Sequence, residues 1–249
     1  MPNKALFCVV GTDTEVGKTC AATGLSRAFI HLGLDAIAVK PVETGCEMIP
    51  QAEQDGARLA RATGQQIPTA ALRRFRQPLA APLAAERDGE EIDFDALVEM
   101  TRDAVAHAHV GLVEGAGGLL SPITWSKTMV DLTRALHGRA VLVAADRLGT
   151  LNHVCLALSV LAAEHIDVAA VILSQVNAPR SQIPKTSGLV SGGPVDISVG
   201  SNLSSLRRIP GIPPVTYLPH VDTVEAAAGA LYPLAKTLMG IENDGDEVD

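Results

Sequence analysis

Aromatic residues, paired cysteines and long apolar runs are scarce in this chain, and each scarcity excludes a class of protein. Phe, Trp and Tyr make up 3% of the 249 residues while 47% are hydrophobic, so any core must be mainly aliphatic. The four cysteines are far apart and form no CxxC pair, which argues against a disulfide framework or a cysteine-ligated metal. No apolar run approaches the roughly 20 residues of a membrane-spanning helix.

Positive charge is also in short supply. The chain has 20 Lys and Arg against 28 Asp and Glu, which gives a formal net charge of −8 at pH 7. A nucleic-acid-binding protein needs a basic face to displace counterions from phosphates, so we expect small-molecule partners and neither nucleic acid nor membrane. The first residues enter a strand-like pattern without the layout of a cleavable signal, and we expect a cytoplasmic protein.

Short apolar runs alternate with longer helical patterns along most of the chain. The runs are rich in β-branched residues, as in parallel strands that are buried on both faces. The expected strands are Ala5–Val10, Ala36–Val39, Val110–Val113, Ala140–Ala144, Val168–Leu173 and Val215–Leu218. The expected helices are Lys18–Leu32, Asp55–Ala62, Phe94–Ala106, Val130–Leu136, Leu151–Glu164 and Val224–Leu238. The alternation predicts one α/β domain over residues 1–241, with a mainly parallel central sheet flanked by helices on both faces.

Two stretches depart from this alternation. Residues 178–214 are rich in Gly and Ser and show no helical period, which predicts a long mobile loop or lid. Residues 242–249 are mostly acidic and predict a disordered tail. In such folds ligands bind at the carboxyl ends of the strands, so the loops that follow the strands are where a site is expected.

The clearest chemical signal is the segment GTDTEVGKT at residues 11–19. It follows a predicted strand and opens a predicted helix, so backbone N–H groups and the helix dipole converge on an anion. Lys18 would reach phosphate oxygens, and the Thr19 hydroxyl would bind Mg²⁺. Five residues separate Gly11 from Gly17, one more than in the common phosphate loop, but the strand–loop–helix context is present. The segment predicts a P-loop NTPase-like fold whose nucleotide contacts are Gly11, Thr12, Asp13, Thr14, Glu15, Val16, Gly17, Lys18 and Thr19.

Charged residues at two other strand ends and at one helix start extend this site. Glu114 ends a predicted strand before a glycine-rich turn and would hold Mg²⁺ as a Walker-B carboxylate does. Asp55 begins a predicted helix and is a second metal candidate, although Asp at this position is commonly a helix cap. Lys40 ends another strand at the same sheet edge, where its ammonium group would neutralise a phosphoryl group or a carboxylated substrate, or would lie in solvent.

Four sequence blocks together resemble the dethiobiotin synthetase family of P-loop enzymes. They are GTDTEVGKT at 11–19, KPVETG at 40–45, VEGAGG at 113–118 and LGTLNH at 148–153. The five-residue gap in the phosphate loop is itself characteristic of that family. The resemblance implies an ATP-dependent cyclo-ligase of biotin biosynthesis, which joins CO₂ to the two amines of 7,8-diaminononanoate and yields dethiobiotin, ADP and phosphate.

The resemblance also implies roles for individual residues. Lys18 and Lys40 would stabilise a carbamate and the moving phosphoryl group electrostatically, with Thr14 and Glu15 beside the reacting groups. The implied Mg²⁺ ligands are Thr19, Asp55 and Glu114. Further nucleotide contacts are Glu114, Gly115, Gly117, Gly118, Ser174, Gln175 and Pro219. The substrate contacts are Lys40, Thr44, Gly149, Thr150 and Asn152.

Two features of the expected site depend on the family. Residues 149–152 begin a predicted helix whose N–H groups suit a carboxylate. In the family this stretch binds the substrate's carboxylate tail across a subunit interface, so we expect a homodimer. The family typically reads adenine with an Asn after the strand that here ends at Leu173. This chain offers Gln175, or Asn177 if the alignment shifts, so the preference among ATP, CTP and GTP stays open.

Three alternatives remain. A regulatory or partitioning P-loop ATPase usually carries a second lysine early in the phosphate loop, where this chain has Thr12, Asp13 and Thr14. An amide synthase of the cobyrinate type usually carries a glutaminase domain, for which 249 residues leave no room. A nucleotide-binding relative without ligase activity is suggested by the unusual stretch 178–214. Phosphate release that depends on the diamine would separate these alternatives from the synthetase.

Overall fold

The centre of the molecule is a six-stranded sheet in which every strand is parallel to its neighbours. A computed structural model of the chain describes residues 4–176, 196 and 198–241. The strand order is β10-β9-β8-β1-β5-β2. These strands are β1 (Ala5–Gly11), β2 (Ala36–Val39), β5 (Val110–Glu114), β8 (Arg139–Ala145), β9 (Val168–Ser174) and β10 (Val215–Leu218). The predicted α/β class with a parallel central sheet is confirmed.

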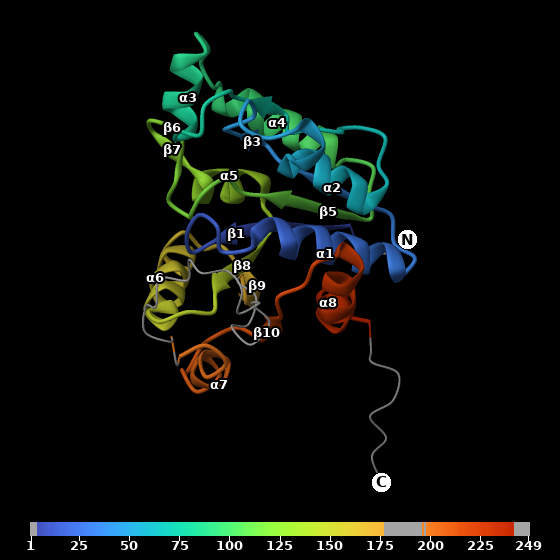
Figure 1. Cartoon of the computed structure of the whole chain (residues 1–249), viewed down its shortest axis with the longest axis vertical. Helices are drawn as coiled ribbons and strands as arrows, with labels where there is room; N and C mark the ends of the chain where they lie inside the picture. Colours follow the sequence, from blue (N-terminus) through green and yellow to red (C-terminus); the bar gives the residue numbers. More distant parts are fainter. Residues whose placement is uncertain (1–3, 177–195, 197, 242–249) are drawn as a thin grey trace, which may run out of the picture.

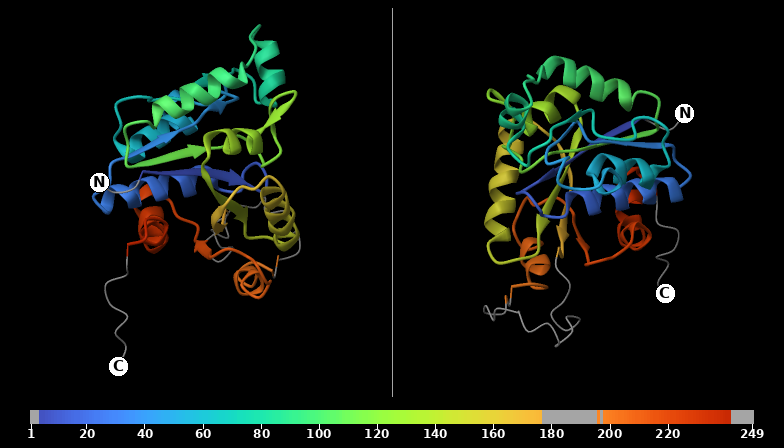
Figure 2. Two further views of the ribbon diagram at one scale, coloured as in Figure 1. Left: turned by 180° about the vertical axis from the view of Figure 1, so that it is seen from behind. Right: turned by 45° about the horizontal axis from the view of Figure 1, so that its top comes forward.

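Helices cover both faces of this sheet, as Figure 1 and the right-hand view of Figure 2 show. One face packs against α1 (Lys18–His31), α2 (Asp55–Thr63) and α8 (Val224–Leu238). The other face packs against α3 (Ala81–Arg87), α4 (Phe94–Ala104), α5 (Met129–Leu136), α6 (Thr150–Ala163) and α7 (Asn202–Leu206). The sheet is therefore the middle layer of three.

Alternation along each strand divides the apolar side chains between two cores. In β1, Phe7 and Val9 join the core beneath α1 and α8, whereas Cys8 and Val10 join the core on the opposite face. The ring of Phe7 stacks on Phe29 of α1 with centroids 6.0 Å apart. Because both faces are covered, the strands are apolar at nearly every position, which explains why their sequence runs lacked a polar alternation.

Several short elements have no counterpart in the sequence-based prediction. Strand β3 (Val42–Glu43) pairs in parallel with β4 (Arg73–Arg74), and β6 (Pro122–Thr124) pairs antiparallel with β7 (Lys127–Thr128). A 3₁₀ turn at Gln51–Glu53 precedes α2. Segments of two or three residues contain about one hydrophobic period at most, which is too little for a pattern to be recognised.

The stretch 178–214, for which the sequence predicts a long loop or lid, contains one short helix, α7, in its later part. Asp146, at the end of β8, accepts hydrogen bonds from Gly200 N at 2.8 Å and from Asn202 Nδ2 at 2.7 Å. Leu206 is fully buried. A five-residue helix is stabilised by such tertiary contacts rather than by its own periodicity. The remaining part of the predicted lid, 178–195 and 197, and the predicted tail 242–249 lie outside the described residues.

The way each helix begins separates two groups. Helices α4 and α8 are capped by the side chains of Asp93 and Thr223, and α5 begins with a Thr128–Asp131 capping box. By contrast, the N-cap residues of α1 and α6 are left-handed glycines, which have no side chain to cap the helix. A glycine at the N-cap leaves the first N–H groups of a helix to an anion or to the backbone, and in α6 the Thr150 N–H donates to the Arg147 carbonyl oxygen at 3.2 Å.

The cysteines and the apolar helices bear on two expectations from the sequence, which predicts neither disulfides nor membrane-spanning helices. All four cysteines are free thiols in the described part of the chain. No helix within the described ranges is long and apolar enough to cross a bilayer.

Candidate active site

The phosphate loop joins β1 to α1 at the carboxyl edge of the sheet. It ends at Gly17, whose φ of 93° is left-handed and suits glycine. At Gly11 a Cβ would lie 2.9 Å from Nζ of Lys18 and 2.8 Å from the carbonyl oxygen of Asp13, so no side chain fits there. The Lys18 ammonium donates a hydrogen bond to that same carbonyl at 2.8 Å. The loop is therefore folded closely around its lysine.

Four polar side chains from separate elements converge beside this loop. Lys40, after β2, places its Nζ 2.7 Å from Glu114 Oε1 at the end of β5 and 2.8 Å from Asp55 Oδ2 at the start of α2. The Thr19 hydroxyl oxygen on α1 lies 2.7 Å from Glu114 Oε1 and 2.9 Å from Asp55 Oδ1. Lys40 and Glu114 are buried, at 4% and 1% exposure, so this charge cluster is largely removed from solvent.

Burial and neighbouring charges set the protonation of the cluster. Burial and repulsion from Lys40 lower the pKa of Lys18 to about 8, although Glu114 and Asp55 partly oppose that change. Burial also disfavours the charged form of Lys40, but its two carboxylate partners outweigh burial and raise its pKa. Burial raises the pKa of Glu114, and Asp55 raises it further, whereas the ion pair with Lys40 lowers the pKa of Asp55 despite burial. Lys40 is thus held charged, and Lys18 is the lysine nearer to neutrality.

The oxygen atoms of the cluster fit a magnesium ion. Within the described residues Glu114 Oε2 is buried and has no hydrogen-bond partner. A buried carboxylate oxygen is normally satisfied, and Mg²⁺ prefers hard oxygen ligands. No group of three or more His, Cys, Asp and Glu residues in the described part of the chain has the geometry of a metal site. An ion here would also use the Thr19 hydroxyl, phosphate oxygens and water.

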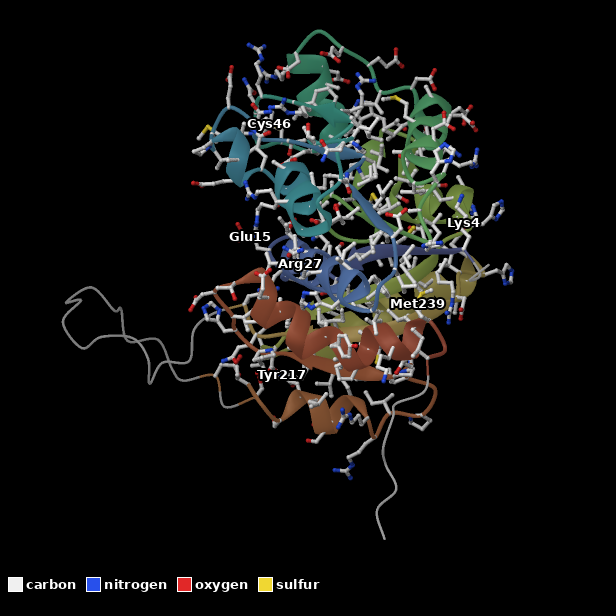
Figure 3. All side chains as sticks on the ribbon, turned by 90° about the vertical axis from the view of Figure 1, so that its right-hand side faces the viewer. Lys4, Glu15, Arg27, Cys46, Tyr217 and Met239 are labelled. Atoms are coloured by element: carbon white, nitrogen blue, oxygen red, sulfur yellow. The ribbon has the colours of Figure 1, made fainter. Side chains whose placement is uncertain are left out.

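A cavity of about 420 Å³ opens beside the phosphate loop and the cluster. The predicted residues that line it are Thr14, Glu15, Gly17, Lys18, Thr19, Lys40, Asp55, Glu114, Gly117, Ser174, Gln175 and Pro219. In Figure 3 the labelled Glu15 marks the phosphate-loop part of this region and Tyr217 marks β10. The structure thus brings together most of the residues predicted for nucleotide, metal and phosphoryl transfer.

The other predicted residues lie outside this cavity. Gly11, Val16 and Gly115 are buried and do not line it. A second cavity of about 450 Å³ is lined by Thr12, Asp13 and Gly118 together with residues of α6. The predicted substrate contacts Thr44, Gly149, Thr150 and Asn152 line neither cavity.

The start of α6 is built like the start of α1. Gly149, the N-cap residue, has a φ of 90° and carries no side chain that could cap the helix. The Thr150 hydroxyl oxygen is buried and has no hydrogen-bond partner among the residues that the structure places, while Asn152 is exposed. Arg147 Nη2 lies 3.3 Å from Asp13 Oδ2, which ties this turn to the phosphate loop. The turn therefore offers polar groups suited to a carboxylate, next to the phosphate loop.

Four residues that the sequence reasoning missed also line the first cavity: Cys20, Arg58, Val176 and Val221. Arg58 stands three positions after Asp55 on α2, and an i, i+3 spacing would have placed both on one helix face. Tyr217 was missed as well, and its hydroxyl lies 3.0 Å from Gln175 Oε1. That contact orients the amide that the sequence offered as a base-reading group.

Comparisons with known proteins first show the broad class of protein to which the chain is similar. Residues 5–228 match a family described as an AAA domain. The fold is similar to that of a ParA family ATPase from Chlorobium tepidum TLS, with a TM-score of 0.53, 14% identity, and coverage of 96% of this chain and 98% of that one. A DUF1611 family protein from Anabaena variabilis gives a TM-score of 0.55 at 15% identity, covering 96% of this chain and 58% of that one. These likenesses are of fold alone, and they confirm the P-loop NTPase-like architecture.

The proteins that are similar in sequence identify a narrower family. An ATP-dependent dethiobiotin synthetase, BioD, from Caulobacter vibrioides is 40% identical over 194 residues, 75% of this chain and 86% of the relative. The enzyme of the same name from Anaeromyxobacter dehalogenans is 34% identical over 230 residues, 92% of this chain and 95% of the relative. That from Haloferax mediterranei is 32% identical over 241 residues, 96% of both chains. The chain therefore belongs to the dethiobiotin synthetase family, as its four sequence blocks predicted.

Proposed function

We propose that this protein is an ATP-dependent dethiobiotin synthetase, which forms the ureido ring of dethiobiotin from 7,8-diaminononanoate and CO₂ in biotin biosynthesis. One observation carries the proposal beyond family membership. The buried ammonium group of Lys40 is fixed 2.7 Å and 2.8 Å from the carboxylates of Glu114 and Asp55, and it lines the same cavity as the phosphate-loop Lys18. Phosphoryl transfer to an anionic acceptor requires positive groups held on both sides of the moving phosphoryl group.

The reaction divides into three steps. One substrate amine adds to CO₂ and loses a proton, which gives a carbamate. A carbamate oxygen then attacks the γ-phosphorus of ATP, and the bond from that phosphorus to the bridging oxygen breaks as ADP leaves. The second amine attacks the carbonyl carbon of the carbamic–phosphoric anhydride, phosphate departs, and the loss of a proton completes the ring. Each step builds or moves negative charge, so electrostatic stabilisation is the main requirement.

The cavity residues meet this requirement in distinct ways. Lys18 would exchange its contact with the Asp13 carbonyl for phosphate oxygens, and Lys40 would hold its charge beside the carbamate. Thr14 and Glu15 line the cavity and would orient the amines. Thr19, Asp55 and Glu114 would hold Mg²⁺, which when bound neutralises charge on the phosphate oxygens.

The carboxylate tail of the substrate is proposed to bind across a homodimer interface. Gly149, Thr150 and Asn152 do not line the phosphate cavity of the single chain. The glycine N-cap of α6 and the Thr150 hydroxyl, which has no partner within the described residues, support a carboxylate site there. A second subunit would bring that site to the diamine.

The test is phosphate release from ATP with each co-substrate omitted in turn. Release is expected only when 7,8-diaminononanoate and bicarbonate are both present, and it should fall at least about 100-fold in Lys18→Ala and Lys40→Ala. Lys236→Ala, on α8 and away from the cavity, is the matched control and should retain activity. Phosphate release that is indifferent to the diamine would instead indicate a regulatory ATPase, and its absence a nucleotide-binding relative without ligase activity.

A further inference from the structure

The buried side chain of Glu43, in the KPVETG block, has no role in the steps described above. It lies on β3 and is 5% exposed. Its Oε1 accepts a hydrogen bond from Asp55 N at 2.6 Å, and its Oε2 accepts one from Gly56 N at 3.0 Å. These are the first two N–H groups of α2, whose own N-cap residue, Gln54, makes no side-chain cap. Glu43 therefore caps α2 from a different element.

The start of α2 has few other fixed points on this side. Residues 47–53, which lead into α2, are all exposed. Cys46, labelled in Figure 3, precedes them, and its carbonyl accepts a hydrogen bond from Gln54 Nε2 at 2.9 Å. Behind the helix, a Cβ at Gly56 would lie 2.2 Å from Ala71 N, so that backbone is already in close contact. The helix start is held between the Ala71 backbone and the two bonds to Glu43.

Asp55 is the residue that this arrangement orients. Its backbone N–H is bound by Glu43, and its carboxylate reaches Thr19 Oγ1 at 2.9 Å and Lys40 Nζ at 2.8 Å. A carboxylate at a helix N-terminus is stabilised by the helix dipole, so Glu43 suits this position electrostatically. A shift of the first turn of α2 would carry the Asp55 oxygens away from the cluster.

We propose that Glu43 is a positioning residue, which fixes the first turn of α2 so that the Asp55 carboxylate faces the metal and phosphate site. The inference rests on the metal role of Asp55 in the proposed function. Groups that orient a metal ligand without touching the metal typically change metal affinity about 10-fold to 100-fold when they are removed. Glu43 thus sets how tightly the site holds a divalent ion beside the nucleotide.

The test measures metal binding directly, with Mn²⁺ as a paramagnetic probe and ADP present. Glu43→Gln keeps the size of the side chain but turns one acceptor oxygen into an NH₂ group that faces a backbone N–H. We expect the Mn²⁺ dissociation constant to rise about tenfold, while ADP binding in EDTA stays within about twofold. In an Asp55→Asn background the same substitution should add nothing, because the ligand that it orients is already lost.

The control is Asp93→Asn, which removes a helix-capping carboxylate on α4, where Asp93 accepts a hydrogen bond from Ala96 N at 3.0 Å. Because asparagine also caps helices, this variant should change stability little, and it should leave Mn²⁺ affinity unchanged. If Glu43→Gln does not fold, the Mn²⁺ dissociation constant of Glu43→Asp is measured instead. That variant keeps a carboxylate but on a shorter side chain. Unchanged Mn²⁺ affinity in the folded variant, or an equal loss in the Asp55→Asn background, overturns the role of Glu43. Failure of the unaltered chain to bind Mn²⁺ would overturn the metal part of the proposed function instead.

Discussion

At the scale of single residues, Lys18 is the one of the two cavity lysines whose charge is more open to change. Burial and Lys40 lower its pKa to about 8 from an ordinary value of 10.5, whereas a bound triphosphate favours the charged form. Below pH 8 the lysine is charged both before and after nucleotide binding. Above pH 8 the nucleotide-free chain has lost that proton, so binding must take one up. ATP affinity should therefore fall by up to about tenfold per unit as the pH rises from 8 toward 10.5.

Isothermal titration at pH 7 and pH 9, in buffers with different ionisation heats, measures this proton uptake. We expect Lys18 to take up nearly one proton per bound nucleotide at pH 9 and almost none at pH 7. Lys18→Met should abolish the difference, and Lys127→Met, on the β6–β7 hairpin outside the cavity, should leave it intact. Equal uptake at both pH values would contradict the lowered pKa of Lys18.

At the scale of elements, helices α1 and α8 pack in close contact at a glycine. A Cβ at Gly24 would lie 2.8 Å from the Cβ of Ala227 and 3.1 Å from its carbonyl carbon. Arg27 of α1, labelled in Figure 3, also pairs with Glu225 of α8 at 3.1 Å. Gly24→Ala should force the helices apart and lower the free energy of unfolding by about 1–3 kcal/mol.

The matched comparison is Gly229→Ala in the interior of α8. Apart from the chain neighbours and the helix's own backbone, no heavy atom of the described residues lies within 4 Å of a Cβ built at Gly229, so the new methyl group meets no obstacle. Alanine is favoured over glycine in a helix, and this variant should be more stable by about 0.5–1 kcal/mol. Urea denaturation of both variants measures the two effects, and changes of the same sign would contradict the close packing at Gly24.

The length of an element decided how well its sequence predicted it. The strand Ala36–Val39 and the helix Val224–Leu238 have the bounds that their patterns predicted, and the helix predicted over Phe94–Ala106 ends two residues earlier, at Ala104. The elements that were missed are short, such as α3 with seven residues and α7 with five. A short element contains too few periods to stand out, and its contacts come from distant parts of the chain.

At the scale of the whole molecule, large apolar side chains are exposed near the start and outer face of α6. Leu148, Leu156 and Leu120 are 79%, 58% and 60% exposed, and the last two line the second cavity. Exposed apolar groups gathered in one region mark an interaction surface. We therefore expect the homodimer to form through this region, where the predicted site for the substrate's carboxylate tail begins.

Leu156→Asp tests this surface, because a charge there would be buried on association. The variant should be monomeric by light scattering and lose ring closure, yet bind ADP as the unaltered chain does. Met100→Asp, at a 42% exposed position on α4, should remain dimeric. An unaltered chain that is monomeric at micromolar concentration would contradict the predicted dimer.

Local chemistry is what could be predicted before the fold was known. The phosphate loop is nine consecutive residues, and its glycine, lysine and threonine act through neighbouring backbone, so their order alone predicts a nucleotide site. The alternation of strands and helices is likewise a periodic property of the chain, and the four family blocks are read directly from it. The sequence-based prediction missed Arg58 and Tyr217 because neither residue lies in one of the four family blocks.

The tertiary structure decided which distant groups meet. Lys40 reaches Asp55 and Glu114 across 15 and 74 positions of sequence, and their distances of 2.8 Å and 2.7 Å depend on the parallel pairing of β2 with β5 and on the placement of α2. The cap that Glu43 provides, and the separation of the nucleotide cavity from the start of α6, also exist only in the folded chain. Such contacts join segments through loops that carry no periodic signal, so the spacing of residues along the sequence cannot specify them.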